Sequence, residues 1–175
     1  MKIAIIGFSG SGKSTLARKL GEKYGIPVLH MDRVHWKPNW VENTREDEIK
    51  VVEDFLNTHD SWVIDGNYFR ICAEDRFSEA DKIVALLFSP LACYLRAKRR
   101  LNKYKGTSRP DMTEGCNEKI DREFCRWIFF DGRNKKKREQ YREIIKTYPN
   151  KTVVLKNQRQ LTRFCKENGI KEGTK

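Results

Sequence analysis

The 175-residue sequence has little of what marks secreted, membrane-spanning or metal-stabilised proteins. Its five cysteines form no C-x-x-C pair, and their odd number and scattered spacing argue against a disulfide framework or a zinc site. No apolar run approaches the ~18 residues that a membrane-spanning helix needs, and the apolar stretch 3–6 is too short for a signal peptide. Internal repeats and low-complexity linkers are also missing. We therefore expect one domain over residues 1–175, with reduced cysteines, in the cytoplasm and without a membrane partner.

Acidic residues are too few to balance the basic ones, since 24 Asp and Glu face 36 Lys and Arg and the formal net charge is +12. Residues 96–109 hold seven Lys or Arg and no acid, and five of the six residues 133–138 are basic. Such runs indicate solvated helix surface, a set of phosphate contacts or a nucleic-acid patch. No helix-turn-helix, zinc-finger or RNA-binding sequence pattern accompanies them. Nucleic acid therefore stays a possible partner that the sequence does not favour.

Short apolar runs alternate with helical patterns along the whole chain. The predicted strands cover residues 2–6, 27–32, 61–66, 82–88 and 151–156. The 82–88 run is the most apolar and predicts a central strand, and Thr44 with Asp47 predicts a capped helix over 45–59. This alternation predicts an α/β fold with a five-stranded, mainly parallel sheet flanked by helices. In such a sheet a ligand binds outside the carboxyl ends of the strands.

A glycine-rich loop follows the first predicted strand and matches G-x-x-x-x-G-K-[ST]. Its glycines allow successive backbone N–H groups to point inward at phosphate, while Lys13 reaches the β- and γ-phosphates and Ser14 ligates Mg²⁺. A dinucleotide-binding fingerprint does not fit, because Thr15 stands where its last glycine would be. The sequence predicts ATP or GTP with Mg²⁺. The nucleotide-binding set is Gly7, Ser9, Gly10, Ser11, Gly12, Lys13, Ser14 and Thr15.

Two aspartates follow predicted strands and point to the same edge of the sheet. Asp65 ends the third strand and precedes Gly66, so it could hold a magnesium-bound water beside Ser14 or simply form a turn. Asp32 ends the second strand and could orient or deprotonate an acceptor hydroxyl, share the metal, or pair with Arg33. We expect Asp65 to serve the metal and Asp32 the acceptor.

The segments 5–20, 28–32 and 62–70 resemble the adenylate kinase-related group of small P-loop kinases. The resemblance is closer to the FlaR-like subgroup labelled "DNA topology modulation protein". The motifs that carry it are His30-x-Asp32, Trp36-x-Pro38-x-Trp40, Asp65-Gly66-Asn67-Tyr68, Arg109-Pro110-Asp111, Gly115-Cys116-x-Glu118 and Phe124-x-x-Trp127. It implies a P-loop fold of nucleoside-monophosphate-kinase type with an arginine-rich lid at 100–118 and an acceptor-side insertion at 33–61. The chain departs from adenylate kinases in reading D-G-N-Y-F-R rather than D-G-F-P-R, and it shows no AMP signature.

Further candidate residues follow from this resemblance. Arg96 and Arg100 share a helix face and would neutralise the transferring phosphoryl group, or they are surface charge. Arg133 begins a polar helix and would close on the nucleotide phosphates. Trp36 and Trp40 could stack a planar acceptor or cover the core beneath the lid. The D-G turn adds two residues to the acceptor side, Asn67 and Arg70.

Two functions are compatible with these patterns. The favoured one is a kinase that moves the γ-phosphoryl group of ATP to a small acceptor such as a nucleotide or nucleoside. The alternative is an ATP-regulated nucleic-acid binder that modulates DNA topology, as the subgroup label and the net charge of +12 indicate.

Overall fold

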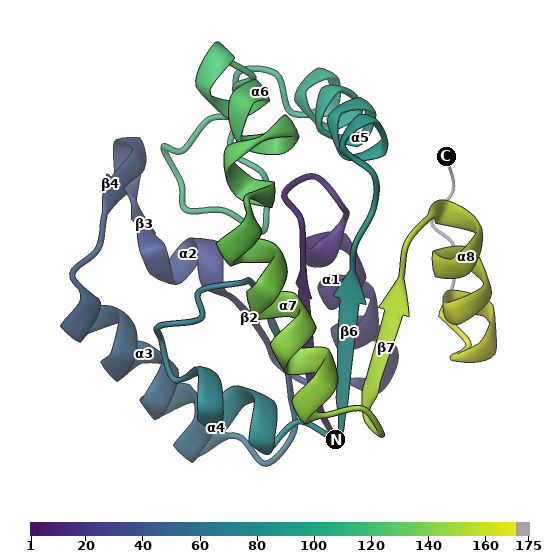
Figure 1. Cartoon of the computed structure of the whole chain (residues 1–175). Helices are drawn as coiled ribbons and strands as arrows, with labels where there is room; N and C mark the ends of the chain where they lie inside the picture. Colours follow the sequence, from purple (N-terminus) through teal and green to yellow (C-terminus); the bar gives the residue numbers. More distant parts are fainter. Residues whose placement is uncertain (171–175) are drawn as a thin grey trace.

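Five parallel strands in the order β2-β5-β1-β6-β7 form the centre of the computed structural model, which describes residues 1–170 (Figure 1). Every neighbouring pair is parallel, so all five carboxyl ends meet at one edge. The strands are β1 (Lys2–Gly7), β2 (Val28–His30), β5 (Trp62–Asp65), β6 (Lys82–Leu86) and β7 (Thr152–Leu155). The five predicted strands and the α/β class are confirmed.

Burial explains why these apolar runs become strands of a parallel sheet. All residues of Trp62–Asp65 and all but the first of β1 and β6 are buried, as expected for strands covered on both faces. The central position belongs to β1, and the 82–88 run supplies the inner strand beside it. The glycine-rich loop therefore leaves the middle of the sheet at its carboxyl edge.

Helices cover both faces, with α7 crossing in front of the sheet and α1 behind it in Figure 1. Their bounds are α1 (Lys13–Tyr24), α3 (Arg45–Thr58), α4 (Ala73–Ser78), α5 (Pro90–Lys103), α6 (Arg122–Phe129), α7 (Lys135–Thr147) and α8 (Gln158–Glu167). Asp47 N donates to Thr44 Oγ1 at 3.2 Å, which confirms the predicted cap of α3. Within residues 1–170, no helix is both long and apolar enough to cross a membrane.

The segment between β2 and α3 differs from its prediction. The second strand ends at His30, and the helix α2 (Met31–His35) follows it directly. Met31 and Val34 are buried three residues apart, and this helical spacing holds the turn against the core. A two-stranded antiparallel hairpin comes next, formed by β3 (Trp36–Lys37), the 3-10 turn η1 (Pro38–Trp40) and β4 (Val41–Glu42). Residues 31–42 are therefore mostly regular secondary structure, and Asp32 lies in a helix rather than at the end of the predicted strand 27–32.

Candidate active site

The glycine-rich loop joins β1 to the first turn of α1 at the centre of the carboxyl edge. Gly10 and Gly12 have φ values of 77° and 99°, which side chains other than glycine rarely adopt. A Cβ atom at Gly10 would also lie 2.5 Å from the carbonyl oxygen of Cys93. Within residues 1–170, the amides of Gly10, Gly12 and Lys13 donate no hydrogen bond to the chain. These free donors at a helix N-terminus suit a phosphate anion.

Contacts from two other segments hold this loop in place. Asn67 clamps its first residue, because its Oδ1 accepts from Gly7 N at 3.0 Å and its Nδ2 donates to Gly7 O at 2.9 Å. Trp127 Nε1, on α6, donates to Ser9 Oγ at 3.0 Å. The acceptor-side role expected for Asn67 stays a prediction, and in this structure both ends of its amide contact the loop backbone.

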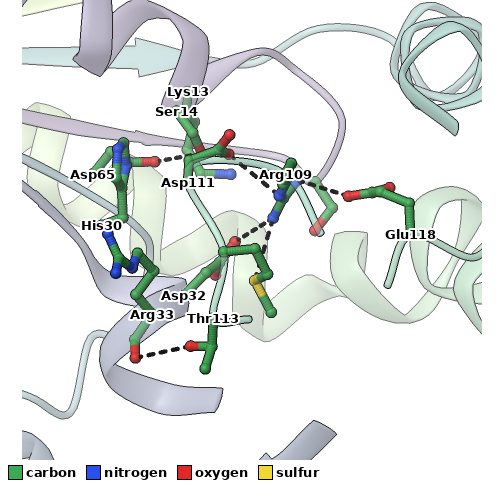
Figure 2. Close-up of polar contacts among 12 residues, drawn as sticks. Lys13, Ser14, His30, Asp32, Arg33, Asp65, Arg109, Asp111, Thr113 and Glu118 are labelled. Carbon is green, nitrogen blue, oxygen red and sulfur yellow. Dashed lines mark hydrogen bonds and ion pairs between the residues drawn. The ribbon is translucent and has the colours of Figure 1, made fainter. Parts of the chain in front are cut away.

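Ser14 and Asp65 lie together at the start of α1 and the end of β5. Ser14 Oγ donates to Asp65 Oδ2 at 2.8 Å, and Asp65 is almost completely buried (Figure 2). The other carboxylate oxygen of Asp65 contacts His30 Nδ1, since the parallel register places His30 directly beside Asp65. A hydroxyl and a carboxylate are the oxygen ligands that Mg²⁺ prefers, so this pair fits the metal. Among residues 1–170, no group of three or more His, Cys, Asp or Glu side chains could hold a metal ion.

Lys13 projects from the first position of α1 into the same region (Figure 2). Its Nζ lies 3.4 Å from the carbonyl oxygen of Phe8, within the loop itself. Burial lowers the pKa of Lys13, and the negative charges of Asp32 and Asp65 oppose this shift. The ammonium group thus lies between two carboxylates and the free amides of the loop.

Asp32 is held by two donors from distant parts of the chain. Tyr68 OH donates to its Oδ1 at 2.9 Å, and Arg109 Nη2 donates to its Oδ2 at 3.2 Å. Burial alone would raise the pKa of Asp32, but the charges of Arg109 and Lys13 outweigh it and the pKa is lowered. Burial and the neighbouring Asp32 raise the pKa of Tyr68 above its usual range, so its hydroxyl remains a donor. Asp32 is therefore an ionised hydrogen-bond acceptor near neutral pH.

The three arginines expected at the nucleotide phosphates have different surroundings. Arg96 Nη1 donates to Ser11 O at 3.1 Å, and its Nη2 contacts Gln158 Oε1, so this side chain joins the loop to the start of α8. Arg100 Nε pairs with Glu118 Oε2 at 2.9 Å and faces the segment 104–121. Arg96 thus donates to the backbone of the glycine-rich loop, and the Arg133 guanidinium lies over the Phe8 ring of the same loop, 3.7 Å from its centroid.

The expected position of Arg133 is wrong in detail, whereas the acceptor-side role of Arg70 stays a prediction. Arg133 lies in the 3-10 turn η2 (Asp131–Arg133), before α7 begins. Its guanidinium donates to Ile128 O at 2.7 Å, Phe88 O at 2.9 Å and Cys93 Sγ at 3.1 Å, which directs it to the protein rather than to phosphate. Arg70 is exposed, and within residues 1–170 no contact joins its guanidinium to Asp32.

Trp36 and Trp40 flank the turn of the β3–β4 hairpin. Their rings pack edge to face with centroids 5.5 Å apart, and the Trp36 ring also meets His35 at 4.6 Å. Both side chains are half-buried. The stacking of a planar acceptor on these two rings stays a prediction. In this structure Trp36 packs against both Trp40 and His35.

The structure adds Arg109, Tyr68, His30 and Trp127 to the residues around the site. All four occur in the sequence motifs described above, but the sequence alone did not predict that they lie beside the aspartates or the glycine-rich loop. Arg109 lies 77 positions from Asp32, and only the folded chain brings the two together. The sequence did offer one indication of these residues. Two polar motifs, Asp65-Gly66-Asn67-Tyr68 and Arg109-Pro110-Asp111, are explained neither by a hydrophobic pattern nor by a helix cap.

A scan against protein-family models gave no match to this chain, and a search of curated proteins gave none either. Solved structures do resemble it. A shikimate kinase from Acinetobacter baumannii in complex with shikimate superposes with a TM-score of 0.54 at 16% identity, covering 97% of this chain and 95% of the other. A shikimate kinase from Bacteroides thetaiotaomicron gives a TM-score of 0.50 at 15% identity, covering 97% and 98%. At such identities the likeness shows a P-loop kinase fold.

Proposed function

We propose that this chain is a kinase that transfers the γ-phosphoryl group of ATP, bound with Mg²⁺, to a hydroxyl group of a small acceptor beside Asp32. The observation that carries the proposal is the convergence of Lys13, Ser14 and Asp65 at the carboxyl edge, with Ser14 Oγ 2.8 Å from Asp65 Oδ2. Free backbone donors in the glycine-rich loop support the binding of phosphate at this edge. The likeness to kinase structures agrees with it at the level of the fold.

Each group has a role that its surroundings support. The loop amides and Lys13 bind the β- and γ-phosphates, and Lys13 offsets the charge that develops during transfer. Ser14 and Asp65 would hold Mg²⁺, which supplies charge neutralisation at the phosphate oxygens. Asp32 accepts a hydrogen bond from the acceptor hydroxyl and orients it toward the γ-phosphorus atom. Its lowered pKa makes it a weak base, which suits a reaction whose transition state is largely dissociative.

The acceptor can be sought directly by incubating the protein with Mg²⁺, ATP and pools of small hydroxyl compounds. The pools separate nucleosides, nucleoside monophosphates, hydroxy acids and sugars, with GTP as a second donor. Mass spectrometry is expected to find one class of compound heavier by a phosphoryl group, with ADP formed in equal amount. The proposal fails if the protein binds ATP but no pool yields a phosphorylated product above the level of a Lys13→Ala control.

His30 is expected to support the metal site through Asp65. We predict that His30→Asn weakens the apparent Mg²⁺ affinity of turnover about tenfold, since it removes the partner that orients Asp65. His59→Asn is the matched control, because His59 lies at the end of α3 and stacks on Phe55. Magnesium titrations of both variants provide the measurement. Equal Mg²⁺ dependence in His30→Asn and wild type would show that His30 only fills space.

The basic residues offer a way to separate the kinase from the nucleic-acid alternative. Arg96→Ala is expected to lower ATP affinity about tenfold, because it removes a charged hydrogen bond to Ser11 of the loop, and to leave DNA affinity nearly unchanged. The double substitution Lys135→Gln/Lys136→Gln removes exposed charges on α7. It is expected to lower DNA affinity and to leave ATP affinity nearly unchanged.

Salt titrations of ATP and DNA binding provide the measurement for these variants. DNA binding by surface lysines falls steeply with salt, with a log–log slope near −0.9 per neutralised phosphate, whereas ATP bound by loop amides responds less. Tight DNA binding at physiological salt that depends on Arg96, together with unchanged ATP affinity in Arg96→Ala, would favour the nucleic-acid alternative.

A further inference from the structure

Tyr68 joins the turn after β5 to the short helix that carries Asp32. Its OH donates to Asp32 Oδ1 at 2.9 Å. Gly66, two residues earlier, has a φ of 138°, and a Cβ atom there would lie 2.5 Å from Met31 Cβ and 3.2 Å from Tyr68 Cδ2. The glycine therefore lets this turn pack closely against the first turn of α2, where Asp32 lies.

The Tyr68 ring also packs against His35, the last residue of α2. The two ring centroids are 4.9 Å apart, and the rings are tilted by 47°. His35 Nδ1 in turn contacts Glu48 Oε1, and Glu48 is only 5% exposed in the first turn of α3. A buried carboxylate is costly unless its partner stays in contact with it. Glu48 therefore fixes the place of the His35 ring.

Backbone contacts also attach the end of α2 to the start of α3. Asn43 N donates to His35 O at 2.7 Å, and Asn43 Nδ2 donates to Val34 O at 3.1 Å. The helix α2 has only five residues, which is too few to hold its shape without such contacts. The orientation of Asp32 therefore depends on side chains that lie outside its own helix.

Asp32 Oδ1 can accept from Tyr68 and from an acceptor hydroxyl at the same time. Each oxygen of an ionised carboxylate has two lone pairs, so the hydrogen bond from Tyr68 leaves one of them open on Oδ1. Burial and the neighbouring Asp32 raise the pKa of Tyr68, so its hydroxyl keeps the proton that it donates. A donor in a fixed place limits the rotation of the carboxylate. The acceptor hydroxyl then meets a carboxylate that is already oriented.

We propose that Tyr68 is a positioning residue for Asp32. The buried pair of His35 and Glu48 keeps the Tyr68 ring in the place that this role requires. Contacts thus run from α3 through the end of α2 to the carboxylate of the site. The inference rests on the proposed function, which assigns the acceptor hydroxyl to Asp32.

Tyr68→Phe tests the positioning role, because it removes the hydroxyl and keeps the ring against His35. The kcat of this variant is expected to fall at least about tenfold, as for the loss of a hydrogen bond to a charged group, with ATP affinity unchanged. Tyr148→Phe is the matched control, since Tyr148 follows α7 and its ring contacts Lys151. Wild-type kcat in Tyr68→Phe would overturn the positioning role.

His35→Asn tests whether the buried pair acts through Tyr68. The asparagine amide can still donate to Glu48, but no ring then packs against Tyr68. The kcat should fall, and the double variant Tyr68→Phe/His35→Asn should be no slower than Tyr68→Phe, because both changes act on the same hydrogen bond to Asp32. Losses that multiply in the double variant, or wild-type kcat in His35→Asn, would show that the pair does not act through Tyr68.

The Asp32 carboxyl gives a readout that does not require turnover. Burial raises the pKa of Asp32, whereas it is lowered by the charges of Arg109 and Lys13, the hydrogen bond from Tyr68 and the charge of Arg100. Carbon-13 NMR titration should therefore give a higher Asp32 pKa in Tyr68→Phe than in wild type and in Tyr148→Phe. An unchanged Asp32 pKa would show that Tyr68 does not donate to Asp32 in solution. A raised pKa together with failure of every acceptor would refute the kinase, and with it the role of Tyr68 in transfer, and would keep the contact itself.

Discussion

Lys13→Ala is expected to lower phosphoryl transfer by about 10³-fold and to weaken ATP binding, while the fold stays intact. The Lys13 ammonium interacts with the charges of Asp32 and Asp65 beside the free amides of the loop, so its loss leaves the γ-phosphate charge uncompensated. Calorimetry gives the ATP affinity and a coupled ADP assay gives turnover. Removal of this partly buried charge costs no hydrogen bond except a 3.4 Å contact to Phe8 O, so thermal unfolding should change little.

Lys23→Ala is the matched control for this substitution. Lys23 lies in the last turn of the same helix and is exposed, so its change should leave both ATP affinity and turnover as in wild type. Unchanged affinity and turnover in Lys13→Ala as well would remove the basis for placing nucleotide at this loop.

Asp32→Asn and Asp65→Asn are expected to separate the acceptor side from the metal side. Asp32→Asn should lower transfer about 10²–10⁴-fold and spare ATP binding, because the amide cannot accept the acceptor hydroxyl as a carboxylate does. Asp65→Asn should instead raise the Mg²⁺ concentration needed for nucleotide binding, since the metal would lose a carboxylate oxygen beside Ser14 Oγ. Calorimetry of ATP at several Mg²⁺ concentrations, together with single-turnover transfer, distinguishes the two.

The pair of variants provides its own control. Both change a carboxylate to an amide near Lys13, so a general electrostatic effect would give them the same pattern. If Asp32→Asn changes the Mg²⁺ dependence and Asp65→Asn does not, the two assignments are reversed. Normal transfer in Asp32→Asn would exclude Asp32 as the residue that orients the acceptor.

The sequence predicts the glycine-rich loop between β1 and α1 well, because loop 7–14 is contiguous and the spacing of its glycines is itself the motif. The five strands were also readable, since runs such as 2–6 and 82–88 are apolar throughout and become buried on both faces. The cap at Thr44 was readable for the same local reason.

What the sequence could not predict depends on contacts between distant segments. Arg109 reaches Asp32 across 77 positions, and Asn67 reaches Gly7 across 60. Spacing along one helix says which arginines share a face, but not that Arg100 meets Glu118. Arg133 looked free to bind phosphate because its backbone acceptors, such as Phe88 O, leave no mark in the sequence.

The destination of the labelled phosphoryl group tests the proposed kinase most directly. Wild-type protein is incubated with γ-³²P-labelled ATP, Mg²⁺ and the acceptor class selected from the pools, and the products are separated. The account predicts label on the acceptor in equal amount to ADP, with loss of that product in Lys13→Ala and Asp32→Asn. Label found only in inorganic phosphate, at the same rate with and without acceptor, would contradict phosphoryl transfer to a small acceptor.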